Sequence, residues 1–210
     1  MSTGELDKMY SDLNTYILDL EIKYIEPHQD PLELPQLYDF DVRSFCILSH
    51  AAFEEFVENI CIKVVDEMES AFKTTQRISY TTLSFLHFNS KPDTIGDDDF
   101  KCTLFEYLKD KLEKAKSTFS NYVIKNNHGV SLKYLDKMLI PLGLDIPSDA
   151  RFIGSLDYLS KYRGGFAHTY KRNVKLLAPE DARSYVEDVN EMMGIITKEA
   201  KNIHYFMIHK

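Results

Sequence analysis

Apolar residues recur at intervals of three and four along most of this 210-residue chain, which is the spacing of amphipathic helices. One such stripe runs from Glu5 to Ile25, and a second keeps the period from Val42 to about Phe72. Between them, the prolines of EPHQDPLELPQLYDF predict an extended linker. The chain therefore begins with a helix that a linker separates from a second, longer helix.

The middle of the chain is less regular. Residues 77–88, RISYTTLSFLHF, contain the β-branched and aromatic residues that strands favour, but no partner strand with turn signals follows. We interpret this stretch as a short helix or an irregular loop. An acidic run then predicts a long helix from about Asp98 to Lys125, because the positive end of a helix dipole favours negative charge. In the following NNHG, Gly129 can adopt the positive φ of a helix stop.

The last third of the chain also has a helical pattern. Ser131 can cap a short helix that ends before Pro141, and another helix runs from about Arg151 into YRGGFAHTY. Pro179 then occupies the favoured first position of a final helix that reaches about Phe206. The pattern predicts an all-α bundle of about five to seven helices. We expect a single domain over residues 1–210, with an N-terminal helix, a Pro-rich linker and a core bundle at residues 1–25, 26–40 and 41–206.

Composition restricts the setting of the protein. Apolar residues make up 44% and charged residues 28% of the chain, as in ordinary soluble domains. The three cysteines form no CxxC pair, which favours a reducing compartment over a disulfide framework or a zinc site. The first residues, MSTGELDKMYSDLN, do not resemble a secretory signal, and no apolar run approaches the length of a membrane span. We expect a cytoplasmic protein with no membrane role, no metal and no cofactor.

The charge of the chain is uneven. The net charge of −8 argues against a general nucleic-acid coat protein, because an acidic surface repels phosphate. However, the segment from Tyr158 to Pro179 contains no acidic residue. Its cations are Lys161, Arg163, Lys171, Arg172 and Lys175. This segment is either a local anion-facing site or a solvated basic helix end, and charge alone leaves both interpretations open.

Arg163 and His168 in this segment, RGGFAH, could together cleave RNA. A guanidinium can hold a phosphate and its transition-state charge, and an imidazole can move a proton near neutral pH. No metal is needed when the 2′-hydroxyl is the nucleophile. On a regular helix the two side chains would point about 140° apart. They would converge through the length of Arg163, a distortion at the glycines, or a second copy of the chain.

The R-x4-H string on a late helix of an all-α bundle resembles the HEPN superfamily. The runs NNHGVSLKYLDKMLIPLGLDIP and LDYLSKYRGGFAHT are similar to the RiboL-PSP branch of HEPN domains, and SHAAFEEFVENI resembles the early helix of such domains. The resemblance covers roughly residues 40–205. It implies a HEPN fold and a metal-independent ribonuclease. Because the superfamily includes members without catalysis, a non-catalytic module for RNA binding, sensing or dimerisation is the alternative.

The resemblance assigns roles to individual residues. Arg163 and His168 match the catalytic pair, and Glu54 matches the early acidic position, where it would orient one of them. Glu55 and Glu58 compete with Glu54 for this role. The alternative for Glu54 is a solvent-facing charge or an ordinary ion pair.

Two further histidines, His50 and His128, lie outside the R-x4-H string. We interpret His50 as a structural residue of the second helix near the surface of the core. His128 is either a cap for the preceding helix or a contact for RNA phosphate.

The resemblance also suggests partners. HEPN ribonucleases generally pair two R-x4-H motifs in one cleft, so we expect a homodimer that binds RNA through Lys161, Lys171 and Arg172. With Tyr170 the motif becomes R-x4-H-x-Y, as in HEPN toxins whose tyrosine is modified by a nucleotidyltransferase. Alternatively, the Tyr170 ring packs in the core. The candidate setting is toxin–antitoxin, anti-phage or stress biology, with an antitoxin, a nucleotidyltransferase or another defence protein as partner.

Overall fold

The computed structural model describes residues 3–90, 103–126, 129–167 and 176–208, and the regular elements within these ranges are all helices. The predicted all-α class is therefore confirmed. The elements are α1 (Thr3–Tyr24), α2 (Pro35–Thr75), α3 (Tyr80–Asn89), α4 (Leu104–Asn126), α5 (Leu132–Leu139), the 3₁₀ helix η1 (Ile140–Leu142), α6 (Ala150–Ala167) and α7 (Pro179–Ile208).

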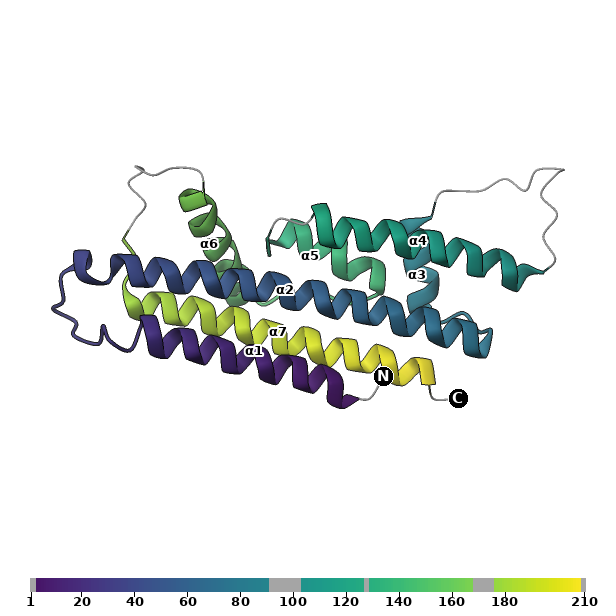
Figure 1. The fold of residues 1–210 in the computed structure, drawn as a ribbon, viewed down its shortest axis with the longest axis horizontal. Coiled ribbons are helices and arrows are strands. Elements are labelled where there is room, and N and C mark those ends of the chain that lie inside the picture. Colours follow the sequence, from purple (N-terminus) through teal and green to yellow (C-terminus); the bar gives the residue numbers. More distant parts are fainter. Residues whose placement is uncertain (1–2, 91–102, 127–128, 168–175, 209–210) are drawn as a thin grey trace.

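The long helix α2 is the centre of the bundle. Helices α1 and α7 run beside it along the long axis of the molecule, and α4 and α6 pack on it at different points along its length (Figure 1). Helix α3 packs on α4 and η1, and α5 continues into η1. Because α2 is covered on several sides, its Phe45, Phe53, Ile60 and Met68 are all at most 1% exposed. Burial of each such side chain contributes about 1.5–3 kcal/mol to stability.

Helix α2 begins seven residues earlier than the apolar stripe predicted, at Pro35 instead of Val42. The sequence pattern places Pro35 in the linker. Proline is tolerated in the first turn of a helix, where its missing N–H would have no intrahelical partner. Pro35 therefore starts α2, and the predicted linker at residues 26–40 is shorter than expected because residues 35–40 are helical.

Local capping decides two other boundaries. Ser79 accepts a hydrogen bond from the Thr82 backbone N–H at 3.0 Å, so the stretch with strand-like composition becomes the short helix α3. Thr103 is not helical, and its hydroxyl accepts a hydrogen bond from the Glu106 backbone N–H at 3.2 Å. Helix α4 therefore starts after Thr103 instead of running on from Asp98, and Asp98 itself lies outside the described residues.

The linker between α1 and α2 is held by His28. Its Nδ1 lies 3.0 Å from a Glu33 oxygen, and its Nε2 lies 3.0 Å from Asp41 of α2. The hydrogen bond with Asp41 is the main cause that raises the pKa of His28 above its ordinary value, and Glu33 raises it further against the opposing effect of burial. His28 thus fastens the linker to the first turns of α2.

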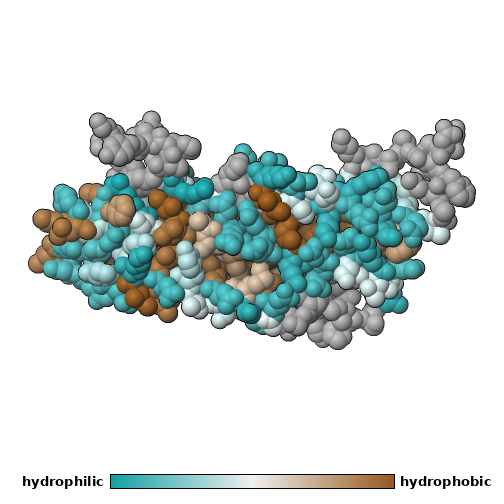
Figure 2. Space-filling model, viewed as in Figure 1, coloured by the Kyte–Doolittle hydropathy of each residue, from teal (hydrophilic) through white to brown (hydrophobic). Residues whose placement is uncertain are grey.

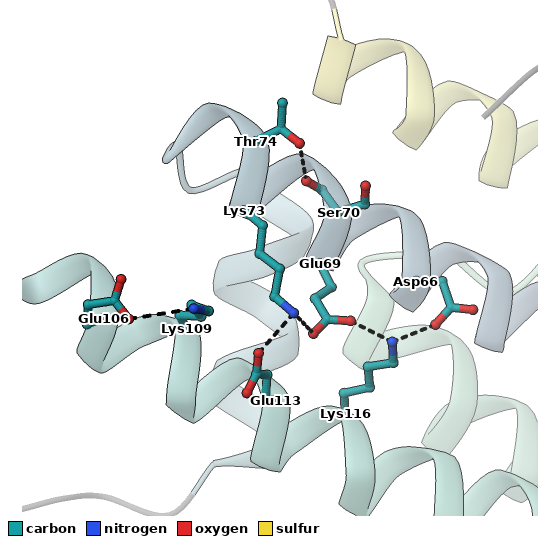
Figure 3. A network of polar contacts seen from close by, with 9 residues as sticks. All are labelled: Asp66, Glu69, Ser70, Lys73, Thr74, Glu106, Lys109, Glu113 and Lys116. Carbon is teal, nitrogen blue, oxygen red and sulfur yellow. Dashed lines mark hydrogen bonds and ion pairs between the residues drawn. The ribbon is translucent and has the colours of Figure 1, made fainter.

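A charged network joins α2 to α4 at the end of α2 far from the linker (Figure 3). Glu69 is mostly buried and contacts both Lys73 on its own helix, at 2.7 Å, and Lys116 of α4. Lys116 also lies 2.8 Å from Asp66, and Lys73 lies 2.9 Å from Glu113 of α4. Two cations and three carboxylates therefore alternate across the α2–α4 contact.

Apolar side chains are exposed at the opposite end of the molecule, around the linker and the start of α2 (Figure 2). They are Leu32, Leu34, Leu37 and Phe40, and each is at least 64% exposed. Exposed apolar groups close together in the sequence often belong to a surface that contacts something else.

Candidate functional site

Arg163 lies near the C-terminal end of α6, where this helix packs against α2. One nitrogen of its guanidinium, Nη2, is 3.7 Å from an oxygen of Glu54 on α2. This separation is an ion pair rather than a short hydrogen bond. The Arg163 side chain is 36% exposed and that of Glu54 is 17% exposed, so the pair lies at the surface with the carboxylate on its inner side.

His50 lies one turn before Glu54 on α2 and is only 2% exposed. Residues four apart share one face of a helix, so the His50 and Glu54 side chains leave α2 in a similar direction. The Nε2 of His50 is 3.2 Å from the Val130 carbonyl oxygen. A carbonyl only accepts, so Nε2 carries the hydrogen and donates it.

The imidazole of His50 is neutral at physiological pH. Burial is the main cause that lowers its pKa to about 4, and the positive charge of Arg163 lowers it further, while the hydrogen bond to Val130 opposes both. A neutral ring beside the guanidinium adds no repulsion.

The turn between α4 and α5 completes the arrangement. Gly129 has a φ of +130°, and a Cβ at this position would come within 3.0 Å of both Arg163 Nη1 and His50 Cε1. The positive φ predicted for Gly129 is therefore confirmed, and the lack of room for a Cβ is a second reason for glycine at this position. The next carbonyl, that of Val130, also accepts a hydrogen bond from the Ser160 hydroxyl, one turn before Arg163 on α6.

Among the three competing glutamates, Glu54 is the one that the structure pairs with Arg163. Glu55 faces α1 instead, where it lines a groove of about 440 Å³ together with Asp12, Tyr16 and Asn59. Glu58 lies a further turn along α2. Burial is the main cause that raises the pKa of Cys61, and the negative charge of Glu58 raises it further.

The basic segment is described only in part. Lys161 is 75% exposed, and its ammonium contacts Asp157, one turn earlier on α6, at 2.6 Å. The acidic residue just before the basic segment therefore already partners one of its cations. His168, Tyr170, Lys171 and Arg172 lie outside the described residues, and so does His128, so their expected roles remain predictions.

Comparison with known protein families shows the family of the chain. A model of the RiboL-PSP-HEPN family matches residues 11–202, which is most of the chain. The chain belongs to this family. No curated protein and no solved structure matches the chain. The match begins within α1, so the N-terminal helix that lies ahead of the sequence resemblance is part of the RiboL-PSP-HEPN domain.

The candidate site combines the Arg163–Glu54 ion pair at the surface with the buried hydrogen bond between His50 and Val130. The guanidinium has five N–H donors, so one edge can face Glu54 while another faces a phosphate.

In the described part of the chain, no three His, Cys, Asp or Glu side chains come together as a metal-binding group. The cysteine at position 46 is buried, which raises its pKa to about 12 and keeps it a thiol.

None of the helices in the described ranges has the length and apolar character that a membrane crossing requires.

The structure brings Arg163 and Glu54 together and adds His50 and the turn at residues 129–130, which sequence reasoning did not single out as part of a site. His50 could have been suspected from its position four residues before Glu54, since such residues share a helix face. Nothing in the sequence places Val130 beside it, because the hydrogen bond joins residues 80 positions apart. The RiboL-PSP-HEPN site is thus built from one local pattern and one long-range contact.

Proposed function

We propose that this chain is a metal-independent endoribonuclease of HEPN type that works in toxin–antitoxin, anti-phage or stress biology. The observation that carries the proposal is the Arg163–Glu54 pair, in which a partly exposed guanidinium is held at the surface by a carboxylate from another helix. Arg163 is also the first residue of the R-x4-H string in a chain of the RiboL-PSP-HEPN family. A fixed guanidinium with a solvent-facing side is what an RNA phosphate requires.

Each residue of the motif has a chemical role in this proposal. His168 removes the proton from the RNA 2′-hydroxyl, whose oxygen then attacks the adjacent phosphorus. The bond from phosphorus to the 5′-oxygen breaks, and this oxygen leaves as a hydroxyl because the protonated His168 returns a proton to it. Arg163 contacts the phosphate oxygens and stabilises the charge of the transition state. Glu54 is a positioning residue that holds the guanidinium, and the products are a 2′,3′-cyclic phosphate and a 5′-hydroxyl end.

Cleavage of an RNA pool in EDTA tests the proposal. The wild type should produce cyclic-phosphate ends, while Arg163→Ala and His168→Ala should lower the rate by two or more orders of magnitude. Arg151→Ala is the matched control, because Arg151 lies at the other end of α6 and pairs with Glu191 at 2.8 Å and Asp188 at 3.1 Å. Its loss should leave cleavage unchanged. A folded wild type that binds RNA without cutting it would favour the non-catalytic module instead.

The homodimer is part of the proposal. If Arg163 of one copy serves beside His168 of the other, mixing Arg163→Ala with His168→Ala protein should restore activity. Half of the randomly mixed dimers would carry one intact site of two, so about a quarter of wild-type activity should return. No recovery from a mixture that has exchanged subunits would mean that each site uses residues of one chain.

Two further parts of the proposal concern residues outside the described ranges. Lys171 and Arg172, with Lys161, would bind the RNA backbone, so their loss should weaken binding most at low salt and make binding less dependent on salt. Nucleotidylation of Tyr170 by a partner would add a charged group next to the motif and silence it. The intact mass of protein purified from its native cells would reveal this modification, and Tyr170→Phe protein would lack it.

A further inference from the structure

A buried polar residue lies under the proposed phosphate clamp. His50 is 2% exposed, and its Nδ1 is buried without a hydrogen-bond partner among the described residues. An unsatisfied buried acceptor is unfavourable relative to a well-packed apolar side chain. The stability of the core alone therefore does not account for a histidine at this position. What the histidine adds is the hydrogen bond from its Nε2 to the Val130 carbonyl oxygen.

That hydrogen bond ends on a carbonyl which two helices share. The Val130 oxygen accepts from His50 Nε2 on α2, at 3.2 Å, and from the Ser160 hydroxyl on α6. One donor is on α2 and the other is on α6, and these two helices pack against each other. The carbonyl thus fixes the turn between α4 and α5 to both helices that carry the ion pair, Glu54 on α2 and Arg163 on α6.

The guanidinium of Arg163 rests on this turn. The position of a Gly129 Cβ would be 3.0 Å from Arg163 Nη1 and 3.0 Å from His50 Cε1, so both side chains pack against the same glycine. A shift of the turn would therefore move the surface that Arg163 lies on. Because the ring of His50 is neutral, it supports the turn without repelling the guanidinium.

We propose that His50 is a positioning residue for Arg163. Through its hydrogen bond to the Val130 carbonyl, it holds the turn at residues 129–130 in the place where the guanidinium packs, and so keeps Arg163 aimed at the RNA phosphate. The role in cleavage rests on the proposed ribonuclease function, whereas the effect on the Arg163 side chain does not.

A pair of substitutions separates the hydrogen bond from simple packing. In His50→Gln the side-chain amide can donate from about the position of Nε2, while His50→Leu keeps the bulk and loses the donor. His50→Leu should lower kcat by about 10- to 100-fold, since a misplaced group of this kind has effects of that size. His50→Gln should stay within a few-fold of wild type, and KM should change less than kcat in both.

A control variant accounts for lost stability. Thr197 is buried on α7, away from the motif, and its hydroxyl donates to the Met193 carbonyl at 2.8 Å. Thr197→Val therefore also removes a buried side-chain hydrogen bond, and it should leave kcat unchanged when all proteins are assayed well below their unfolding temperatures. Equal kcat values for His50→Leu and His50→Gln would overturn the proposal.

A second measurement is independent of RNA cleavage. The Arg163 Nε–H signal in an NMR spectrum, assigned by its loss in Arg163→Lys, reports the order of the guanidinium. We expect a distinct signal in wild type, His50→Gln and Thr197→Val, and a signal merged with the mobile arginines in His50→Leu. An unchanged signal in His50→Leu would refute the positioning role. If wild type cleaves no RNA, the ribonuclease proposal fails and this signal alone decides the role of His50.

Discussion

Arg163 and Glu54 form an ion pair across the contact between α6 and α2, with their nearest charged atoms 3.7 Å apart. The carboxylate is the less exposed of the two groups, so the guanidinium is held from below and keeps a side toward solvent. A pair that is this accessible contributes little to stability, because water screens it. What the ion pair contributes is the position of the Arg163 guanidinium.

Glu54→Gln should therefore affect activity more than stability. Without the carboxylate, Arg163 loses its fixed orientation, and RNA cleavage should fall about 10-fold, while the free energy of unfolding changes by less than about 1 kcal/mol. Glu55→Gln is the control, since Glu55 faces the groove beside α1. Cleavage rates and urea unfolding of both variants provide the check. Equal losses of activity in the two variants would contradict the assignment of Glu54.

Gly129→Ala should damage both the fold and the site. Its φ of +130° is strained for any residue with a Cβ, and the added methyl group would press on Arg163 Nη1 and His50 Cε1. We expect a loss of about 1–3 kcal/mol in the free energy of unfolding, together with reduced RNA cleavage. Gly154→Ala on α6 should instead stabilise by about 0.5–1 kcal/mol, because nothing lies within 4 Å of its added Cβ and alanine is the better helix former. Thermal unfolding of both variants would show opposite shifts.

The depressed pKa of His50 predicts a loss of stability in mild acid. As the pH falls below about 6.5, the unfolded chain binds a proton at this histidine, but the folded protein does not until about pH 4. The stability that this group contributes is thus present above pH 6.5 and declines toward pH 4, by roughly 3 kcal/mol in all. Urea unfolding between pH 7 and pH 4 should show a flatter pH dependence for His50→Gln. Parallel curves for the variant and wild type would count against a buried neutral His50.

The network in Figure 3 predicts a different effect at Glu69. Burial tends to raise the pKa of Glu69, but Lys116 and Lys73 outweigh it, so the pKa is lowered overall. The stability that Glu69 contributes is present above the ordinary pKa of a glutamate and is lost as the pH falls through the lowered value. Glu69→Gln should destabilise by about 1–3 kcal/mol at neutral pH. Glu113→Gln, at a carboxylate that is 46% exposed, should change stability by less than about 1 kcal/mol in the same unfolding assay.

The sequence was sufficient for the helices because each is encoded locally. Periodicity located α1 and α2, and Pro179 located the start of α7. The family resemblance pointed to Arg163 and Glu54, which the structure places 3.7 Å apart. The errors at the starts of α2 and α4 have local causes too, a proline that begins a helix and a threonine that caps one.

The unpredicted part of the site depends on contacts between distant segments. His50 has the apolar surroundings of any core residue of α2, and its relation to Gly129 and Arg163 exists only after three elements pack together. A pattern of three- and four-residue spacings carries no information about which turn will lie on which helix face. The contacts of the buried histidine with this turn could therefore be found only from the folded chain.

The shared carbonyl of Val130 has a consequence for the order of events during synthesis. Its two hydrogen bonds reach back 80 residues to His50 and forward 30 residues to Ser160. Contacts of such long range form late, because the chain between them must first lose its freedom. A nascent chain on the ribosome can therefore form α2, α4 and α5 before α6, which carries Arg163 and Ser160, has joined them. The pair of Arg163 and Glu54 can form only after α6 has emerged from the ribosome and docked on α2.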